Sequence, residues 1–179
     1  MALGPLASSP VVWAMAEADL ERLVEAVVDG DLEALSSLIE GGVDPNLADR
    51  TGNTALKIAV QLGRLDVVER LLEAGARPDA GNEGRSDPAL FRALTSFEVK
   101  ERAPLVRRLL EAGADPNVKL FDGRTPLHEA VSIPGDDGLS CVRLLVEAGA
   151  EPDAEDRDGF TPRSLAERAE VQALLEGET

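Results

Sequence analysis

The sequence of 179 residues is poor in the side chains that most often catalyse reactions or bind metals. It has one cysteine, Cys141, one histidine, His128, and no tyrosine. A single cysteine excludes an internal disulfide framework and favours a reducing compartment. One histidine and one cysteine are also too few for a typical zinc site. We therefore expect no metal, no cofactor and a cytoplasmic, intracellular location.

Aromatic residues make up only 3% of the chain, although 44% of its residues are hydrophobic. A core of Leu, Val and Ala suits thin, closely packed helices better than a large mixed sheet. No stretch is long and apolar enough to cross a membrane. The start has no basic residue before Arg22, and Pro5 and Pro10 interrupt its apolar run. Residues 1–16 are therefore expected to form a loose tail rather than a signal peptide.

Basic residues are also scarce, with 18 Lys and Arg against 34 Asp and Glu and a formal net charge of −16. Such a charge repels nucleic-acid backbones and anionic lipids and favours a basic partner. The alternative is that the carboxylates simply form a solvated surface. In either case the sequence predicts no nucleic acid and no membrane as a partner.

One phrase recurs four times, each time with a glycine followed by a proline three residues later. The copies lie at residues 41–46, 74–79, 112–117 and 148–153, and their shared glycines are 33, 38 and 36 residues apart. Apolar pairs precede each phrase at spacings of three and four, which is one face of a helix. The glycine ends that helix in a left-handed conformation, and the proline prevents the helix from resuming.

A second phrase centres on a threonine, with copies at residues 52–56, 123–128 and 159–162. Threonine caps a helix N-terminus through its hydroxyl group, and proline fits the first helical position. Each unit is therefore a turn, a short helix, a loop and a second helix that a glycine closes. Two short helices cannot bury their apolar faces alone, but stacked copies can.

This pattern resembles the ankyrin repeat. The 33-residue interval, the Thr-Pro-Leu-His of residues 125–128 and the Gly-Ala-Asp-Pro-Asn of residues 113–117 match that family's signature. The resemblance implies an all-α solenoid of about five stacked helix-turn-helix units joined by turns or short hairpins. Within a single domain over 17–179, the expected units are an N-terminal cap over 17–46, repeats over 47–79, 80–117 and 118–153, and a C-terminal cap over 154–179.

The copies differ in length. Residues 80–117 are five residues longer than the regular copy at 47–79, mostly within 95–103, and have Pro88 where threonine is usual. Residues 118–153 gain three residues, around 133–138. Loops on a rigid frame often determine specificity, so both insertions are candidate contact regions. The alternative is a length variation without function.

The residues that could suggest chemistry fit the repeat instead. The resemblance implies that His128 ties neighbouring turns by hydrogen bonds, and Cys141 aligns with the apolar Val67 and Leu105. Recurring Asp and Asn residues, at 44, 46, 115 and 117, indicate turn chemistry. No phosphate-binding glycine loop, serine elbow or complete calcium loop is present. We therefore expect no enzymatic activity.

The resemblance implies that another protein binds to the turn tips and the exposed ends of the first helices, which form a concave face. The tip residues are Arg50, Thr51, Asn53, Phe121, Asp122, Arg124, Arg157, Asp158 and Phe160. The helix-end residues are Val28, Asp29, Gln61, Leu62, Thr95, Ser96, Ser132 and Ile133. Phe97, in the first insertion, is the further candidate contact.

Phe121 is the most conspicuous tip residue, because the family commonly has polar residues there. Its neighbour Leu120 replaces the aspartate of positions 49 and 156. The ring either packs on its own neighbour or is offered to a partner, and both alternatives remain open. Three further apolar side chains could join it in an apolar centre ringed by Arg and Asp, as in interface hot spots. They are Leu62, Ile133 and Phe160.

We therefore expect a module that binds another protein, with a basic protein as the favoured partner, and that is monomeric alone. The most concrete version is an inhibitor that masks a basic surface. The alternatives are a scaffold or adaptor, and a structural protein that associates with itself. An enzyme or small-molecule binder with a groove near the insertions is the least favoured class.

Overall fold

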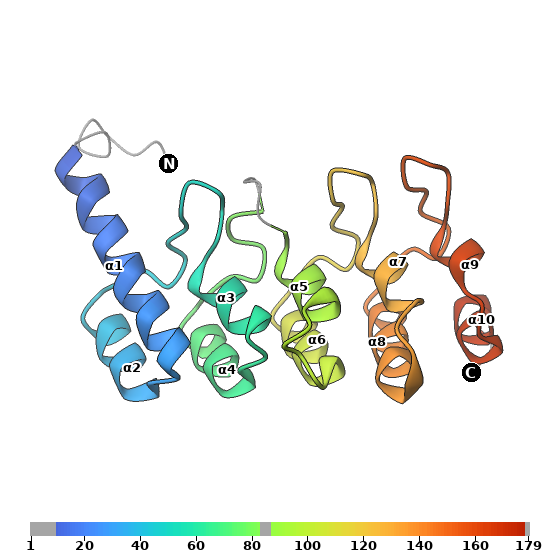
Figure 1. The fold of residues 1–179 in the computed structure, drawn as a ribbon, viewed down its shortest axis with the longest axis horizontal. Helices are drawn as coiled ribbons and strands as arrows, with labels where there is room; N and C mark the ends of the chain where they lie inside the picture. The colour runs from blue at the N-terminus through green and yellow to red at the C-terminus, as the bar shows by residue number, and fades with distance from the viewer. Residues whose placement is uncertain (1–9, 83–86, 178–179) are drawn as a thin grey trace.

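The computed structural model describes residues 10–82 and 87–177, and within them it has ten helices and no regular strand. The helices stand in pairs along a single row, so that the first and last pairs lie at opposite ends (Figure 1). One isolated antiparallel bridge, between Ala48 and Thr54, closes the first turn. The predicted all-α solenoid is confirmed.

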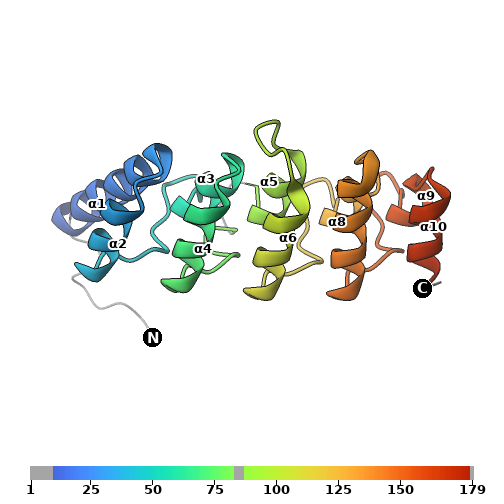
Figure 2. The same ribbon diagram turned by 90° about the horizontal axis from the view of Figure 1, so that it is seen from below.

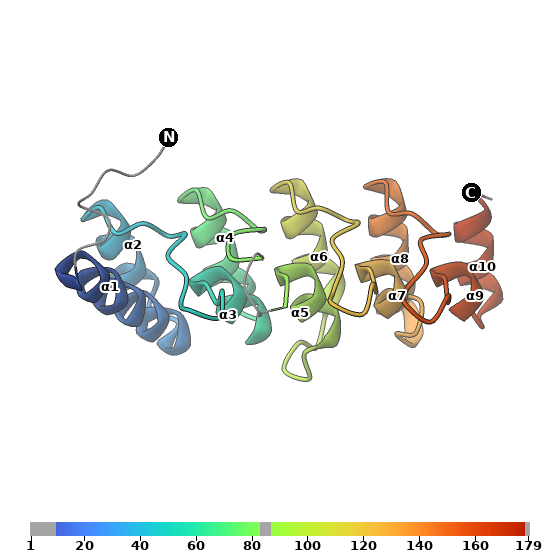
Figure 3. The same ribbon diagram turned by 90° about the horizontal axis from the view of Figure 1, so that it is seen from above.

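Each pair consists of a first helix on the side of the turn tips and a second helix behind it (Figures 1 and 3). The pairs are α1 (Pro10–Asp29) with α2 (Leu32–Glu40), α3 (Ala55–Gln61) with α4 (Leu65–Glu73), α5 (Ala89–Thr95) with α6 (Arg102–Glu111), α7 (Pro126–Ala130) with α8 (Gly135–Glu147), and α9 (Pro162–Leu165) with α10 (Ala169–Glu176).

The two recurring phrases form the helix ends as the sequence predicts. The hydroxyl of Thr54 accepts a hydrogen bond from the backbone N–H of Lys57 at 3.2 Å and so caps α3. Gly75 has φ +89°, beyond the end of α4, where a residue with a Cβ would be strained. Between these ends, Val68 and Leu71 are fully buried. The core continues from repeat to repeat through α1, α3, α5 and α7 and through α2, α4, α6 and α8.

Asparagines link successive turns behind the helices. Asn46 accepts a hydrogen bond from the backbone N–H of Arg77 at 2.7 Å and donates to the carbonyl of Gly75 at 3.1 Å, so it bridges two repeats. Asn117 makes the same pair of bonds to Gly149 and Glu151 of the next repeat, at 2.9 Å each. Within its own turn, Asp44 accepts from the backbone N–H of Asn46 at 2.9 Å. The predicted turn chemistry is confirmed.

His128 and Cys141 belong to the core, as expected. Nδ1 of His128 accepts from the backbone N–H of Thr125 at 3.0 Å, so its Nε2–H donates to the carbonyl of Phe160 in the next turn at 3.1 Å. Cys141 is fully buried, and this burial raises the pKa of its thiol to about 12. Neither side chain is exposed to a substrate.

The prediction of a loose tail over residues 1–16 is wrong for residues 10–16, which form the first two turns of α1. The proline that was taken to interrupt the segment starts this helix, because the first turn tolerates a residue without an N–H group. No further proline or glycine follows before Gly30. Residues 1–9 lie outside the described part of the chain.

Candidate partner-binding surface

The turn tips project on one side of the helix row (Figure 1). In two of them an aspartate organises the turn. One carboxylate oxygen of Asp49 accepts from the backbone N–H groups of Thr51 and Asn53, at 2.8 and 2.9 Å. Asp156 binds its own turn in the same way. Burial raises the pKa of Asp49, but the hydrogen bonds from Thr51 and Asn53 outweigh it and lower the pKa to about 2.

The tip between them is built differently, because Leu120 provides no carboxylate. Leu120 is half-buried, and Asp122 instead accepts the backbone N–H of Arg124 at 3.1 Å. The carbonyl of Asp122 accepts the backbone N–H of Arg157 at 2.8 Å. The tip that carries Phe121 is therefore hydrogen-bonded directly to the last tip.

Phe121 packs on a neighbouring side chain, which is the first of the two alternatives that the sequence leaves open. The guanidinium carbon of Arg157 lies 4.0 Å from the centroid of its ring, which is a cation–π contact between neighbouring tips. The side chain is nevertheless 86% exposed. Its neighbour holds the ring in place while most of its surface stays open to solvent.

Three of the four phenylalanines are exposed, although the chain has few aromatic residues. The exposed fractions are 101% for Phe97, 86% for Phe121 and 52% for Phe160, whereas Phe91 is buried. We call Phe97, Phe121 and Phe160 the exposed aromatic residues. Exposed aromatic side chains on a well-packed frame are typical of binding surfaces.

Leu62 and Ile133 are not free members of the predicted apolar centre. Both are half-buried and pack against the hydrophobic core of the solenoid. Both lie in the segment that joins a first helix to a second helix, where the chain turns back. Of the four expected members of the apolar centre, only Phe121 and Phe160 are therefore exposed.

The first insertion forms a loop over residues 96–101 that extends beyond the neighbouring repeats (Figures 2 and 3). Two side chains fasten it. Ser96 donates to the carbonyl of Gln61 in the preceding repeat at 2.7 Å, and Val99 is only 3% exposed. Phe97 lies between these two residues and is fully exposed.

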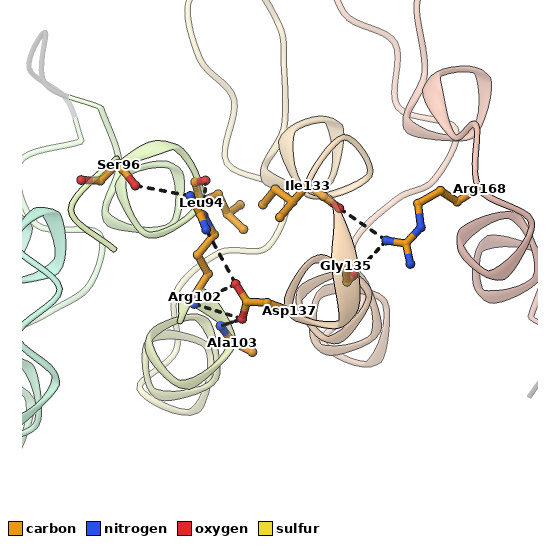
Figure 4. Close-up of polar contacts among 8 residues, drawn as sticks. All are labelled: Leu94, Ser96, Arg102, Ala103, Ile133, Gly135, Asp137 and Arg168. Carbon is orange, nitrogen blue, oxygen red and sulfur yellow. Dashed lines mark hydrogen bonds and ion pairs between the residues drawn. The ribbon is translucent and has the colours of Figure 1, made fainter. Parts of the chain in front are cut away.

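The second insertion holds the beginning of α8, and its Asp137 caps α6 of the preceding repeat (Figure 4). The carboxylate accepts the backbone N–H groups of Arg102 and Ala103 at 3.0 Å. Arg102 in turn donates from Nε to the carbonyl of Leu94 at 2.9 Å. Glu101, directly before α6, makes no side-chain cap. The two insertions are therefore joined to each other.

Arg168 holds the same insertion from the following repeat (Figure 4). Its Nη1 donates to the carbonyls of Gly135 at 2.9 Å and Ile133 at 3.5 Å. Between the two insertions lies a shallow cavity of about 490 Å³. It is lined by Leu94, Thr95, Lys100, Arg102, Glu129, Ser132, Ile133, Pro134 and Asp137.

The predicted contact residues divide into two groups. Exposed are Arg50, Thr51, Gln61, Phe97, Phe121, Ser132, Arg157 and Phe160. Half-buried are Asn53, Leu62, Leu120, Arg124 and Ile133. Among the second group, Arg124 forms an ion pair with Glu129 at 2.9 Å, and Asn53 accepts a hydrogen bond from Arg92. The second group therefore serves the frame more than the surface.

Sequence reasoning missed Lys57, which is fully buried at the position that His128 occupies two repeats later. Its Nζ donates to the carbonyl of Gly52 at 3.0 Å. Burial lowers its pKa to about 8, and the nearby Arg92 acts in the same direction. The carboxylates that oppose this shift are Asp79, Asp87 and Asp49. Alignment of the two threonine phrases is the signal that could have found this residue.

A family model for ankyrin repeats, in three copies, matches residues 17–82 and 90–177. The chain belongs to the ankyrin-repeat family. Repeats of this family are in general protein–protein interaction modules and are not themselves catalytic. In the described residues, no three His, Cys, Asp or Glu side chains are grouped so that they could hold a metal ion, and no helix could span a membrane.

The ankyrin-repeat chain is similar to parts of several longer proteins. It is 36% identical over 118 residues to the E3 ubiquitin-protein ligase Ufd4 of Drosophila melanogaster, which covers 61% of this chain and 4% of the ligase. It is 32% identical over 111 residues to an ankyrin repeat-containing protein of Treponema pallidum, which covers 62% of this chain and 36% of that protein.

A third relative is human ankyrin repeat domain-containing protein 39, with 39% identity over 83 residues, 43% of this chain and 45% of that protein. The chain thus spans less than half the length of each of these three relatives. The similarity is to their repeats, so it indicates the kind of module and not an activity.

Proposed function

We propose that this ankyrin-repeat protein is a non-catalytic module that binds a partner protein through its turn tips and its first insertion. The observation that supports the proposal is the exposure of Phe97, Phe121 and Phe160 on the surface of a frame with a well-packed core. Burying a phenylalanine side chain stabilises a complex by about 1.5–3 kcal/mol. Three such residues would serve as apolar anchors within a larger contact surface.

The surroundings of Phe121 support the same conclusion. Arg157 covers one part of the ring, and Asp122 and Arg124 flank it in the same turn. Binding energy in protein interfaces concentrates on aromatic and arginine side chains that polar residues surround. A partner that covers the ring would strengthen the existing contact with Arg157 by excluding water from it.

The role that the charge supports is masking. A net charge of −16 attracts a basic surface and speeds its association, while the aromatic residues provide short-range contacts. We propose that the partner has a basic surface and that binding covers it, so that the protein acts as an inhibitor or neutralising partner. A scaffold or adaptor would have to bind two proteins at once, which the experiment below can also detect.

The test is site-specific cross-linking in cells. A photoreactive amino acid at position 97, 121 or 160 should cross-link one and the same partner. The matched control is position 143 on the exposed side of α8, which should not react. The double variant Phe121→Ser/Phe160→Ser should weaken binding of that purified partner about 30-fold or more, which corresponds to about 2 kcal/mol.

The outcomes separate the alternatives. Cross-links at position 143 alone would contradict the proposed surface. Cross-links between two copies of the chain, with a dimer in sedimentation velocity that the double variant dissolves, would show self-association. Different partners at 97 and at 121 would indicate a scaffold.

A further inference from the structure

The negative charge lies at the two ends of the solenoid and is densest at the N-terminal end. Residues 17–46 have nine carboxylates and one arginine, a net charge of −8 and half of the total of −16. Residues 47–117 have eleven acidic and eleven basic residues and are neutral. Among the described residues, ion pairs engage only Glu17 and Asp19 of the nine carboxylates. Residues 118–179 have 14 acidic and six basic residues and also a net charge of −8, but it is spread over 62 residues instead of 30.

Helix α1 also has no counterpart in the other repeats. It has 20 residues, whereas the other first helices have four to seven. The middle of this helix lies beside the turn at residues 47–51 (Figure 1). Between the two lies a cavity of about 780 Å³, which we call the N-terminal groove. Its lining residues are Ala16, Glu17, Leu20, Glu21, Leu47, Ala48, Asp49, Arg50 and Thr51.

The groove combines an apolar floor with an acidic rim. Leu20, Leu47 and the two alanines provide the floor. Asp49 keeps its charge throughout the physiological pH range, because hydrogen bonds within its turn outweigh burial and lower its pKa to about 2. Glu21 is exposed at the same rim.

One arginine opposes these carboxylates. Arg50 pairs with Glu17 at 3.2 Å, but the two side chains are 91% and 57% exposed. An ion pair this exposed contributes at most about 1 kcal/mol, so a competing cation can displace Arg50. The rim therefore remains net negative and accessible.

We propose that the N-terminal groove binds a basic amphipathic segment of the partner, with an apolar side chain on the floor and Arg or Lys side chains on Glu17, Glu21 and Asp49. The charge selects the occupant, because the same carboxylates repel nucleic acid and anionic lipid. The proposal rests on the proposed protein-binding function, but it concerns the opposite end of the solenoid from Phe121 and Phe160.

A peptide tests the groove without the partner. The probe is a fluorescein-labelled 12-residue peptide of repeated Arg-Leu-Arg triplets, and its binding is followed by fluorescence anisotropy in 0.1 M salt. The variant Glu17→Gln/Glu21→Gln should weaken binding about tenfold. The matched control Glu147→Gln/Glu151→Gln removes the same amount of negative charge from the C-terminal half and should weaken binding less than twofold.

A second probe tests the floor. Replacing every leucine of the peptide with serine should weaken binding at least fivefold, although the charge is the same. Equal losses for the two pairs of variants, or no effect of the serine peptide, would mean unspecific attraction and would overturn the proposal. A dimer in sedimentation velocity that Glu17→Gln/Glu21→Gln dissolves would make a second copy the occupant and would also overturn it.

The two proposals can fail separately. The Phe121→Ser/Phe160→Ser variant should bind the Arg-Leu-Arg peptide as tightly as the wild type does. If the peptide binds in the groove but no partner cross-links at positions 97, 121 or 160, then the aromatic surface is wrong and the groove stands. If the partner cross-links there and the peptide ignores the groove, only the further inference fails.

Discussion

The loop between the two helices of a repeat is short in the regular copy and long in the next one. Residues 62–64 join α3 to α4, and there Arg64 donates to the carbonyl of Val28 at 2.6 Å. Residues 96–101 join α5 to α6. Ser96 and Val99 fasten this loop to the rest of the molecule, while Phe97 is exposed. The extra residues thus add a new surface and leave the packing of the repeat unchanged.

The largest expected effect tests whether the packing is really the same in regular and lengthened repeats. Leu71 and Leu145 occupy matching positions in α4 and α8, and both are fully buried. Leu71→Ala and Leu145→Ala should each lower the free energy of unfolding by about 3 kcal/mol, since both leave a cavity in a closed core. Urea unfolding measures this. A cost for Leu145→Ala of less than half the cost for Leu71→Ala would show that the lengthened repeat unfolds separately.

The next effect concerns Lys57, which occupies the buried position that His128 has two repeats later. The pKa of Lys57 is lowered from 10.5 to about 8 in the folded protein. Between these values the unfolded chain binds a proton that the folded chain does not. The contribution of Lys57 to the free energy of unfolding therefore increases as pH rises from 8 towards 10.5. The gain is on the order of 2–3 kcal/mol.

The measurement is the difference between wild type and Lys57→Met in urea unfolding from pH 7 to 10. Methionine fills similar space without a charge, so the difference should change with pH in favour of the wild type. The thiol of Cys141, whose raised pKa acts in the opposite direction above pH 9, is present in both proteins and cancels. A difference that is constant with pH would show that Lys57 is solvated in the folded state.

The smallest of the three effects concerns the link between the insertions. Asp137→Ala should cost about 1–2 kcal/mol, because α6 loses the only side-chain cap at its N-terminus that the structure describes. Hydrogen exchange at the amides of Arg102 and Ala103 should become faster. Asp136→Ala removes the same charge from an exposed neighbour and should cost less than about 0.5 kcal/mol. Equal costs would make the effect one of charge and not of capping.

The helices and the core could be predicted from the sequence because the same residue pattern recurs in each repeat. Apolar spacing, threonine caps and closing glycines recur at matching positions in several repeats. The structure of an irregular repeat can therefore be inferred by alignment with its neighbours. The same alignment places His128 and Cys141 in the core. Lys57 was within reach of that argument, because it stands at the histidine position of a regular copy.

The surface could be predicted only in part, because it depends on contacts between segments that no spacing rule connects. Asp136 and Asp137 are adjacent and alike in sequence, yet only the second carboxylate reaches α6, 34 and 35 residues earlier. Leu62 and Ile133 occupy exposed positions in the family pattern, but the chain turns there and packs them on the core. The helical start at Pro10 was missed because proline ends most helices and begins some.

The cap that Asp137 places on α6 limits how this protein can be shortened, duplicated or recombined. A repeat whose helix is completed by the next repeat cannot be the last one in an array without a new cap. A deletion or swap that separates the two lengthened repeats over 80–153 would therefore leave α6 without this cap. A variant array that divides this pair should accordingly need a new capping residue before Arg102.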